Sequence, residues 1–139
     1  MQICQFQKQH YEQLRGYWQQ YGWVSPDMDL LPKNGFVAIK DDKVVAAAFV
    51  YQSCSGMALL DWVIADKNAQ PLTRGKAVYS VINACRDFAK DKGFKVLYTV
   101  TANEHLQDTY RKIGFKDMEK NATSMAMSLD GSSLGFLRE

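Results

Sequence analysis

Four consecutive residues at the start of a predicted helix have the types needed to bind a phosphate group. They are Arg74, Gly75, Lys76 and Ala77. The first N–H groups of a helix have no partners within it, and together with the helix dipole they attract anions. Small residues let a ligand approach the backbone closely, and the two basic side chains add positive charge. The same residues would also suit an ordinary helix start with two solvated bases, and this stretch alone leaves both interpretations open.

Residues 57–115 contain the elements that would position this turn. Residues 57–64 form a short apolar run, which is typical of a buried strand. Thr73 could cap a helix whose apolar residues recur three and four positions apart until Gly93 ends it. Residues 95–101 alternate as a second strand. A helix that joins two parallel strands begins near their carboxyl ends, where α/β folds usually bind ligands.

Two segments of this region resemble the signature of the GNAT superfamily, the acyl-CoA-dependent N-acyltransferases. That signature pairs an R-G-x-G type loop at the central helix with a downstream N-x6-Y-x-x-x-G-F segment. The chain matches the second part, with its spacing kept, at Asn103, Tyr110, Gly114 and Phe115. The first part matches in two incomplete registers. One register puts Tyr79 at a small-residue position, and the other puts Leu72 at the leading basic position.

The resemblance implies an α/β, GNAT-like fold with a mixed, mostly antiparallel central sheet of six or seven strands flanked by helices. A single domain would cover residues 1–139. It also implies an N-acetyltransferase, with acetyl-CoA as the acyl donor and a primary amine as the acceptor. The acetyl group would move by direct attack of the amine on the thioester.

The resemblance further implies which residues hold acetyl-CoA. Backbone groups of Trp62, Val63 and Ile64 would bond the pantetheine arm and polarise the thioester carbonyl, as an oxyanion hole does. The turn at residues 74–77 would cradle the pyrophosphate. Asn103 would bond the pantetheine, although it could equally be only a helix cap.

Tyr110 and Asp61 are the candidate catalytic residues. In the family, the tyrosine before x-x-x-G-F lies near the CoA sulfur, where a phenol can protonate the leaving thiolate. The alternative is an aromatic ring that only packs. Asp61 is the sole carboxylate of residues 57–64, and strict alternation puts it on the face opposite Trp62. A β-bulge would turn it inward as the base for the amine. Otherwise Asp61 makes a structural contact and water relays the proton.

The residue patterns before residue 57 predict three strands and one helix. Residues 2–6 alternate like a short edge strand, and residues 8–21 have apolar positions at helical spacing. Residues 35–40 and 43–51 are strands joined by a two-residue hairpin at Asp41-Asp42.

The segment after residue 101 predicts a helix and a last hairpin. Asn103 would cap a helix over residues 104–112, which Gly114 ends. Residues 115–119 and 123–129 are expected to pair as antiparallel strands around a turn at residues 120–121.

Residues 22–34 are the candidate acceptor site, because the corresponding segment lines the acceptor side in the family. Trp23 lies there beside Asp27 and Asp29. An apolar wall with carboxylates suits an amine cation on an apolar body, which predicts a small-molecule or peptidyl amine. The alternative is a surface loop whose acids simply face water.

Composition and charge narrow the classes of partner and ligand that the protein could bind. A net charge of +2 with interspersed signs argues against a nucleic-acid partner, including a charged tRNA. Three scattered cysteines (Cys4, Cys54, Cys85) and two distant histidines predict no metal site and reduced thiols in a cytoplasmic protein. No apolar run has a membrane-spanning length, so no membrane partner is expected. The oligomeric state stays open, a homodimer included.

A rival function comes from a different class. The incomplete phosphate turn and the lack of an obvious base also fit a catalytically degenerate GNAT-like domain that serves as a binding or assembly module.

Overall fold

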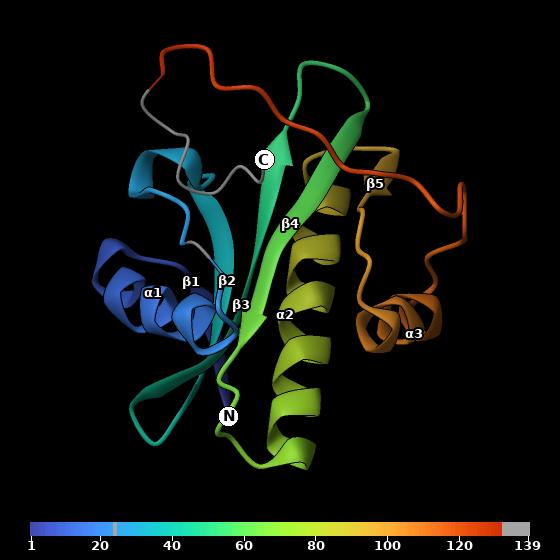
Figure 1. The fold of residues 1–139 in the computed structure, drawn as a ribbon. Helices are drawn as coiled ribbons and strands as arrows, with labels where there is room; N and C mark the ends of the chain where they lie inside the picture. The colour runs from blue at the N-terminus through green and yellow to red at the C-terminus, as the bar shows by residue number, and fades with distance from the viewer. Residues whose placement is uncertain (24, 132–139) are drawn as a thin grey trace. The chain divides into compact units, whose positions relative to one another are not determined.

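The computed structural model describes residues 1–23 and 25–131, where a five-stranded sheet has α1 on one face and α2 on the other (Figure 1). Its strands, in spatial order, are β1 (Gln2–Gln5), β2 (Asn34–Lys40), β3 (Lys43–Gln52), β4 (Met57–Ala65) and β5 (Val96–Tyr98). The helical elements are η1 (Lys8–His10), α1 (Tyr11–Gln20), η2 (Met28–Leu30), α2 (Pro71–Asp91) and α3 (Glu104–Ile113). β1 to β4 pair antiparallel and β5 pairs parallel with β4. The mixed, mostly antiparallel sheet is therefore confirmed.

The contacts of the chain divide it into two compact units, Met1–Thr99 and Val100–Glu139. The first unit holds all five strands together with α1 and α2, and the second holds α3. A single domain over the whole chain stays a prediction.

The expected sixth and seventh strands are wrong, because residues 115–119 and 123–129 form no strand. The chain does bend at Lys120 and Asn121, and Asn121 takes a left-handed φ of 58°. The alternating side chains Met125 and Met127 are 89% and 79% exposed. Alternation therefore predicted a strand here, but a strand also needs a ladder partner for its backbone groups. None is present among residues 1–23 and 25–131.

The predicted hairpin between β2 and β3 is confirmed. Asp41 and Asp42 have φ values of 52° and 61°, as a type I′ turn requires at both central positions. Gly35 on β2 lies so close to Phe49 on β3 that an added Cβ would meet the ring at 2.4 Å. The close approach of β2 to this ring therefore explains a glycine at that position.

Each face of the sheet is covered by one helix of the first unit. Leu14, Tyr17 and Trp18 of α1 belong to a buried cluster with Phe49 and Ile64 of the sheet. On the other side, α2 buries a stripe made of Ala77, Val81, Ile82, Cys85 and Ala89. Phe88 of α2 packs edge-on against Phe36 of β2, with ring centroids 6.0 Å apart. This agrees with the amphipathic patterns of both segments.

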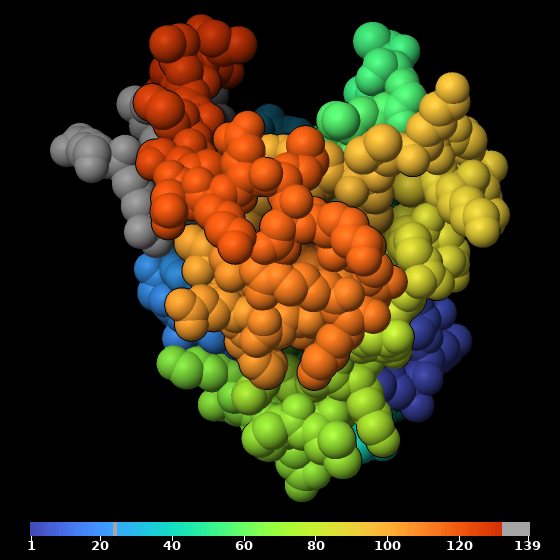
Figure 2. Space-filling model, turned by 90° about the vertical axis from the view of Figure 1, so that its right-hand side faces the viewer, coloured from blue at the N-terminus to red at the C-terminus, as the bar shows by residue number. Residues whose placement is uncertain are grey.

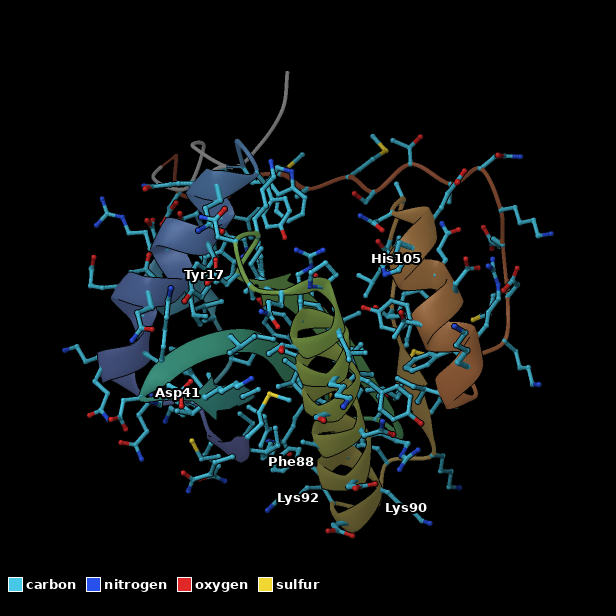
Figure 3. All side chains as sticks on the ribbon, turned by 90° about the horizontal axis from the view of Figure 1, so that it is seen from below. Tyr17, Asp41, Phe88, Lys90, Lys92 and His105 are labelled. Carbon is cyan, nitrogen blue, oxygen red and sulfur yellow. The ribbon has the colours of Figure 1, made fainter. Side chains whose placement is uncertain are left out.

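The helix α2 begins earlier than the sequence predicts. Gln70 is its N-cap, Pro71 is its first residue, and no side chain caps it, so Thr73 is not the cap. A proline is favoured at this position because its φ is already helical and its missing N–H would have no partner there. Figure 3 shows Phe88, Lys90 and Lys92 at the other end of the helix, where the Lys92 ammonium lies 5.6 Å from the Phe88 ring.

The helix α3 of the second unit has both predicted end signals. The Asn103 side chain accepts a hydrogen bond from Leu106 N at 2.9 Å, so it is a helix cap. Gly114 ends the helix with a φ of 125°, a conformation that strains any other residue. No helix in the described part of the chain combines the length and the apolar character needed to cross a membrane.

Candidate functional site

A β-bulge interrupts β4 at the place where the sequence put the candidate base. Ala47 of β3 lies opposite Ile64, and Phe49 lies opposite Asp61, so β4 uses three steps where β3 uses two. Trp62, inside the bulge, has a left-handed φ of 57°, which is uncommon for a bulky residue. Backbone strain of this kind persists only where the surroundings hold it, and it is frequent at functional sites.

The bulge places Asp61 and Trp62 on the same side of the sheet. Directly opposed residues share a face, so Asp61 lies on the face of Phe49, which α1 covers. Trp62 packs edge-on against Trp18 of α1, with ring centroids 6.2 Å apart. Strict alternation, which separates the two, is therefore wrong, and the alternative of a β-bulge in this strand is confirmed.

Asp61 has the environment of a carboxylate that could accept a proton. Its Oδ1 accepts a hydrogen bond from the Trp62 amide at 2.7 Å. No group among the described residues donates a hydrogen bond to Oδ2. Every buried side-chain oxygen in this part of the chain has a partner, so we infer that Oδ2 is accessible to solvent. Burial raises the pKa of Asp61 above its usual value, and the Trp62 amide bond only partly offsets this. A raised pKa improves proton transfer near neutral pH.

Tyr51 completes this cluster, and sequence analysis did not identify it. Its hydroxyl accepts a hydrogen bond from Trp62 Nε1 at 2.7 Å and donates one to the Leu30 carbonyl at 2.6 Å. Tyr51 lies near the end of β3, and in the sequence nothing distinguishes it from any other aromatic residue of a strand. Only the bulge brings the Trp62 indole within its reach.

Within the first unit, β4 and β5 pair only over a short stretch. Their ladder runs from Met57 opposite Val96 to Leu59 opposite Tyr98. One residue further, the Thr99 hydroxyl donates to the Leu60 carbonyl at 3.0 Å. The bulge follows directly, at residues 61–64. The ladder with β5 therefore ends just before the residues expected to bond the pantetheine.

The loop between β4 and α2 is held from several sides. The buried Asp66 carboxylate accepts hydrogen bonds from Asn68 N at 3.0 Å and Gln20 Nε2 at 3.2 Å. Lys43 Nζ lies 3.2 Å from its other oxygen. The Arg74 guanidinium donates to the carbonyls of Lys67 and Ala69, at 2.9 and 3.4 Å. Arg74 thus orders the loop that precedes the helix.

The predicted phosphate turn has been shifted by the early start of α2. The first backbone hydrogen bond of the helix runs from Arg74 N to Gln70 O. Pro71 has no N–H, so the amides without a partner within the helix are those of Leu72 and Thr73. This end of the helix, yellow-green at the bottom of Figure 2, forms part of the surface. Gly75 and Lys76 are exposed in the next turn, while Ala77 is fully buried against the sheet.

The candidate catalytic tyrosine and its motif lie in the second unit. Tyr110 is buried on α3 and packs against Phe115, with ring centroids 5.0 Å apart. The amides of Gly114 and Phe115 donate to the Tyr110 carbonyl at 3.1 and 3.0 Å, which closes the helix. These bonds give the Y-x-x-x-G-F pattern a local structural reason besides any catalytic one.

The candidate acceptor residues lie on an irregular segment that contains η2. Trp23 is 41% exposed and stacks on Tyr21 at a centroid distance of 4.8 Å. Asp27 and Asp29 are exposed at the two sides of Met28. Tyr11 donates to the Pro26 carbonyl at 2.7 Å and so fixes the segment to α1. The described residues include no group of three or more His, Cys, Asp or Glu side chains arranged to hold a metal ion.

We expect the stability of the protein to depend on pH through Asp66. Burial disfavours its charge, but the bonds from Asn68, Gln20 and Lys43 outweigh that and lower its pKa below the usual value. A lowered pKa in the folded state stabilises the protein above the unfolded pKa of about 4, and this contribution is lost as the pH falls through the folded pKa. Asp66→Asn should therefore lower the free energy of unfolding by about 2 kcal/mol at pH 7.

The difference between wild type and Asp66→Asn should begin to shrink as the pH falls below about 4, where the unfolded carboxyl is protonated, and it should keep shrinking until the folded carboxyl is protonated as well. Urea unfolding at pH 7 and pH 3 measures it. The control is Asp87→Asn, on the exposed surface of α2, which should change stability little at either pH. A difference for Asp66→Asn that is equal at both pH values would contradict this account.

Comparison with known proteins identifies the fold. No protein-family model and no curated protein matches the sequence. Among solved structures, a probable acetyltransferase aligns with a TM-score of 0.71 at 20% identity, over 92% of this chain and 99% of the other. The aminoglycoside N-acetyltransferase AAC(6')-Iy, in complex with CoA, aligns with a TM-score of 0.65 at 18% identity, over 91% and 100%. A GNAT-family acetyltransferase from Staphylococcus aureus Mu50 gives 0.67 at 15%, over 88% and 89%. At these identities, the likeness shows that the chain has the GNAT acetyltransferase fold.

Proposed function

Because the chain has the fold of the GNAT acetyltransferases, we propose that it is an acyl-CoA N-acyltransferase. It moves an acetyl group from acetyl-CoA to a primary amine of a small molecule or peptide. The observation that carries the proposal is the bulge of β4, where a left-handed Trp62 adjoins the half-buried Asp61 just beyond the β5 ladder. Strain, a half-buried carboxylate and an interrupted ladder meet at one point, which an ordinary sheet does not require.

In this proposal Asp61 is the general base. Oδ1 is engaged by the Trp62 amide, which fixes the carboxylate, and Oδ2 is left to accept the proton of the attacking amine. The raised pKa of Asp61 suits this task, because a base works best with a pKa close to the working pH.

Acetyl-CoA would supply an activated thioester. The Trp62 amide is already bonded to Asp61, so Val63 and Ile64 are the remaining candidates to donate to the thioester oxygen. The pyrophosphate would bind at the amides of Leu72 and Thr73, with the exposed Lys76 adding charge. Arg74, Gly75 and Ala77 would act on the shape of the turn rather than by direct contact.

Two roles rest on the motif of the second unit. Tyr110 would donate its phenolic proton to the CoA thiolate as it leaves. In the whole reaction, Asp61 would take one proton from the amine and Tyr110 would give one proton to the sulfur. Asn103 would act chiefly as the cap of α3, since its carboxamide oxygen already accepts from Leu106 N.

For the acceptor, we propose a cationic amine on a small or peptidyl body. Trp23 offers an exposed aromatic surface on residues 22–34, and Asp27 and Asp29 are exposed carboxylates beside it. An ammonium group is attracted both to carboxylates and to aromatic faces. The aminoglycoside substrates named for similar structures are amines of this class.

A catalytically degenerate binding module remains the second candidate. The early start of α2 favours it, because Gly75 lies inside the helix, past the first turn whose amides are unpaired, and its backbone cannot cradle a phosphate there. This candidate predicts weak or absent binding of acetyl-CoA.

Calorimetric titration of the purified chain with acetyl-CoA separates the two. We expect binding of one acetyl-CoA per chain, with a dissociation constant in the micromolar to low millimolar range typical of substrates, about 10⁻⁶ to 10⁻³ M. Release of free CoA thiol in the presence of a panel of amines then tests turnover. The absence of heat at millimolar acetyl-CoA would remove the enzyme proposal, and turnover confined to charged tRNA would remove the proposed acceptor class.

A further inference from the structure

A single hydroxyl joins three separate parts of the first unit. Tyr51 lies near the end of β3, and its oxygen bonds both the Trp62 indole in the bulge of β4 and the Leu30 carbonyl at the end of η2. Both bonds are short, 2.7 and 2.6 Å. No other side chain of residues 1–23 and 25–131 is recorded as hydrogen-bonding both the bulge and the η2 segment.

The geometry excludes a role for Tyr51 in proton transfer. The hydroxyl proton is given to Leu30, and an oxygen lone pair accepts from Trp62, so the group is committed in both directions. Burial raises the pKa of Tyr51, and the nearby Asp61 adds to this while the Trp62 bond opposes it. The phenol therefore stays protonated, as its bond to the Leu30 carbonyl requires.

The Trp62 side chain is held at both ends by this arrangement. Its Nε1 is bonded to Tyr51, and its ring packs edge-on against Trp18 of α1. Its backbone has the left-handed φ of 57°, a conformation that costs about 1–2 kcal/mol for a residue with a Cβ. These side-chain contacts contribute the energy that keeps the bulge in this conformation.

From this we infer that Tyr51 is a positioning residue, which ties the η2 segment of the acceptor side to the bulge that carries Asp61. The inference rests on the proposed N-acyltransferase function. The Tyr51 hydroxyl sets the distance between Leu30 and the Trp62 indole. The amine bound beside η2 is therefore presented to Asp61 at a fixed separation. Loss of the hydroxyl would leave binding of acetyl-CoA intact and disturb the alignment of the amine.

The test is Tyr51→Phe, which removes only the hydroxyl and keeps the ring. We expect kcat to fall about 10- to 100-fold, since small misplacements of reacting groups cost up to this factor, with the KM for acetyl-CoA within about twofold of wild type. Trp62→Phe removes the other partner of the bond. The double variant should be no slower than the slower single variant, because both changes break the same link.

The matched control is Tyr11→Phe. The Tyr11 hydroxyl donates to the Pro26 carbonyl at 2.7 Å, so this variant loses a bond of the same length to the same segment. Tyr11 has no recorded hydrogen bond to Trp62 among the described residues. We expect its kcat to stay within about threefold of wild type, while its stability falls by about 1 kcal/mol, less than that of Tyr51→Phe, which loses two bonds.

A second readout does not depend on turnover. The indole N–H resonance of Trp62, assigned by its absence in Trp62→Phe, should shift and exchange faster with solvent in Tyr51→Phe than in Tyr11→Phe. Equal kcat values for Tyr51→Phe and Tyr11→Phe in an active enzyme, or an unchanged indole resonance, would overturn the positioning role alone. A wild-type chain that neither binds nor uses acetyl-CoA would overturn the proposed function and this inference with it.

Discussion

Asp61→Asn should lower kcat by about 10²- to 10⁴-fold, the loss expected when a general base is removed. Asparagine has the shape of aspartate, and its Oδ1 can still accept the Trp62 amide bond that fixes Asp61 in the bulge. The change therefore removes the proton acceptor and leaves the backbone geometry in place. Steady-state measurement of CoA thiol release with a saturating amine gives the value.

The pH profile identifies the group responsible. Burial raises the pKa of Asp61, so the activity of the wild type should fall with decreasing pH at a higher pH than an ordinary carboxyl group would cause. The base works only when it is deprotonated, and the acid limb of kcat/KM reports its pKa in the free enzyme. In Asp61→Asn that limb should disappear.

Stability provides the control for Asp61→Asn. A carboxyl group whose pKa is raised on folding costs stability above its unfolded pKa, because the folded state disfavours its charge. At pH 7 the asparagine variant should therefore be at least as stable as the wild type. Asp87→Asn, an exposed change on α2, should keep wild-type turnover. Full activity of Asp61→Asn with an unchanged acid limb would assign Asp61 a structural contact only.

Tyr110→Phe should lower kcat by about 10- to 10³-fold and leave the affinity for acetyl-CoA nearly unchanged. Phenylalanine keeps the ring that packs against Phe115, so α3 should retain its structure. The variant removes the proton that the phenol would give to the leaving thiolate. Turnover and calorimetric titration of the same preparation separate the two effects.

An exposed tyrosine serves as the control for Tyr110→Phe. Tyr79 on α2 is 48% exposed, and Tyr79→Phe should leave turnover at the wild-type level. If Tyr110→Phe matches it, then Tyr110 has a structural role and gives no proton to the thiolate, and the motif reflects the closure of α3. An acetyl thioester whose leaving thiol has a lower pKa than that of CoA would sharpen the test, because a better leaving group depends less on a general acid.

Sequence patterns determined most of the secondary structure, because the signals are local. Three predicted features are present in the structure. Asp41 and Asp42 take the left-handed φ values of a hairpin turn, Asn103 caps α3, and α2 joins the parallel strands β4 and β5. Each of these depends on the conformational preference of one or two residues or on a repeat of apolar positions within one element. Neighbours far along the chain are not needed to predict them.

Local patterns failed where a second signal competed or a partner was missing. Thr73 is a good cap residue, but Pro71 two positions earlier already fixes a helical φ, so α2 starts there. Residues 123–129 alternate as a strand does, but no strand among the described residues pairs with them. Alternation describes which side chains a strand could bury, whereas the ladder that stabilises it depends on the rest of the fold.

The site itself depended on tertiary structure. The motif indicated Tyr110 and the strand that contains Asp61, but strict alternation separated Asp61 from Trp62. One extra residue in β4 against β3 brings them to the same face, and no residue type in the sequence marks that insertion. The same insertion brings the indole of Trp62 to Tyr51, eleven positions away in the chain. Register is a relation between two strands, so it becomes defined only when β3 and β4 pair.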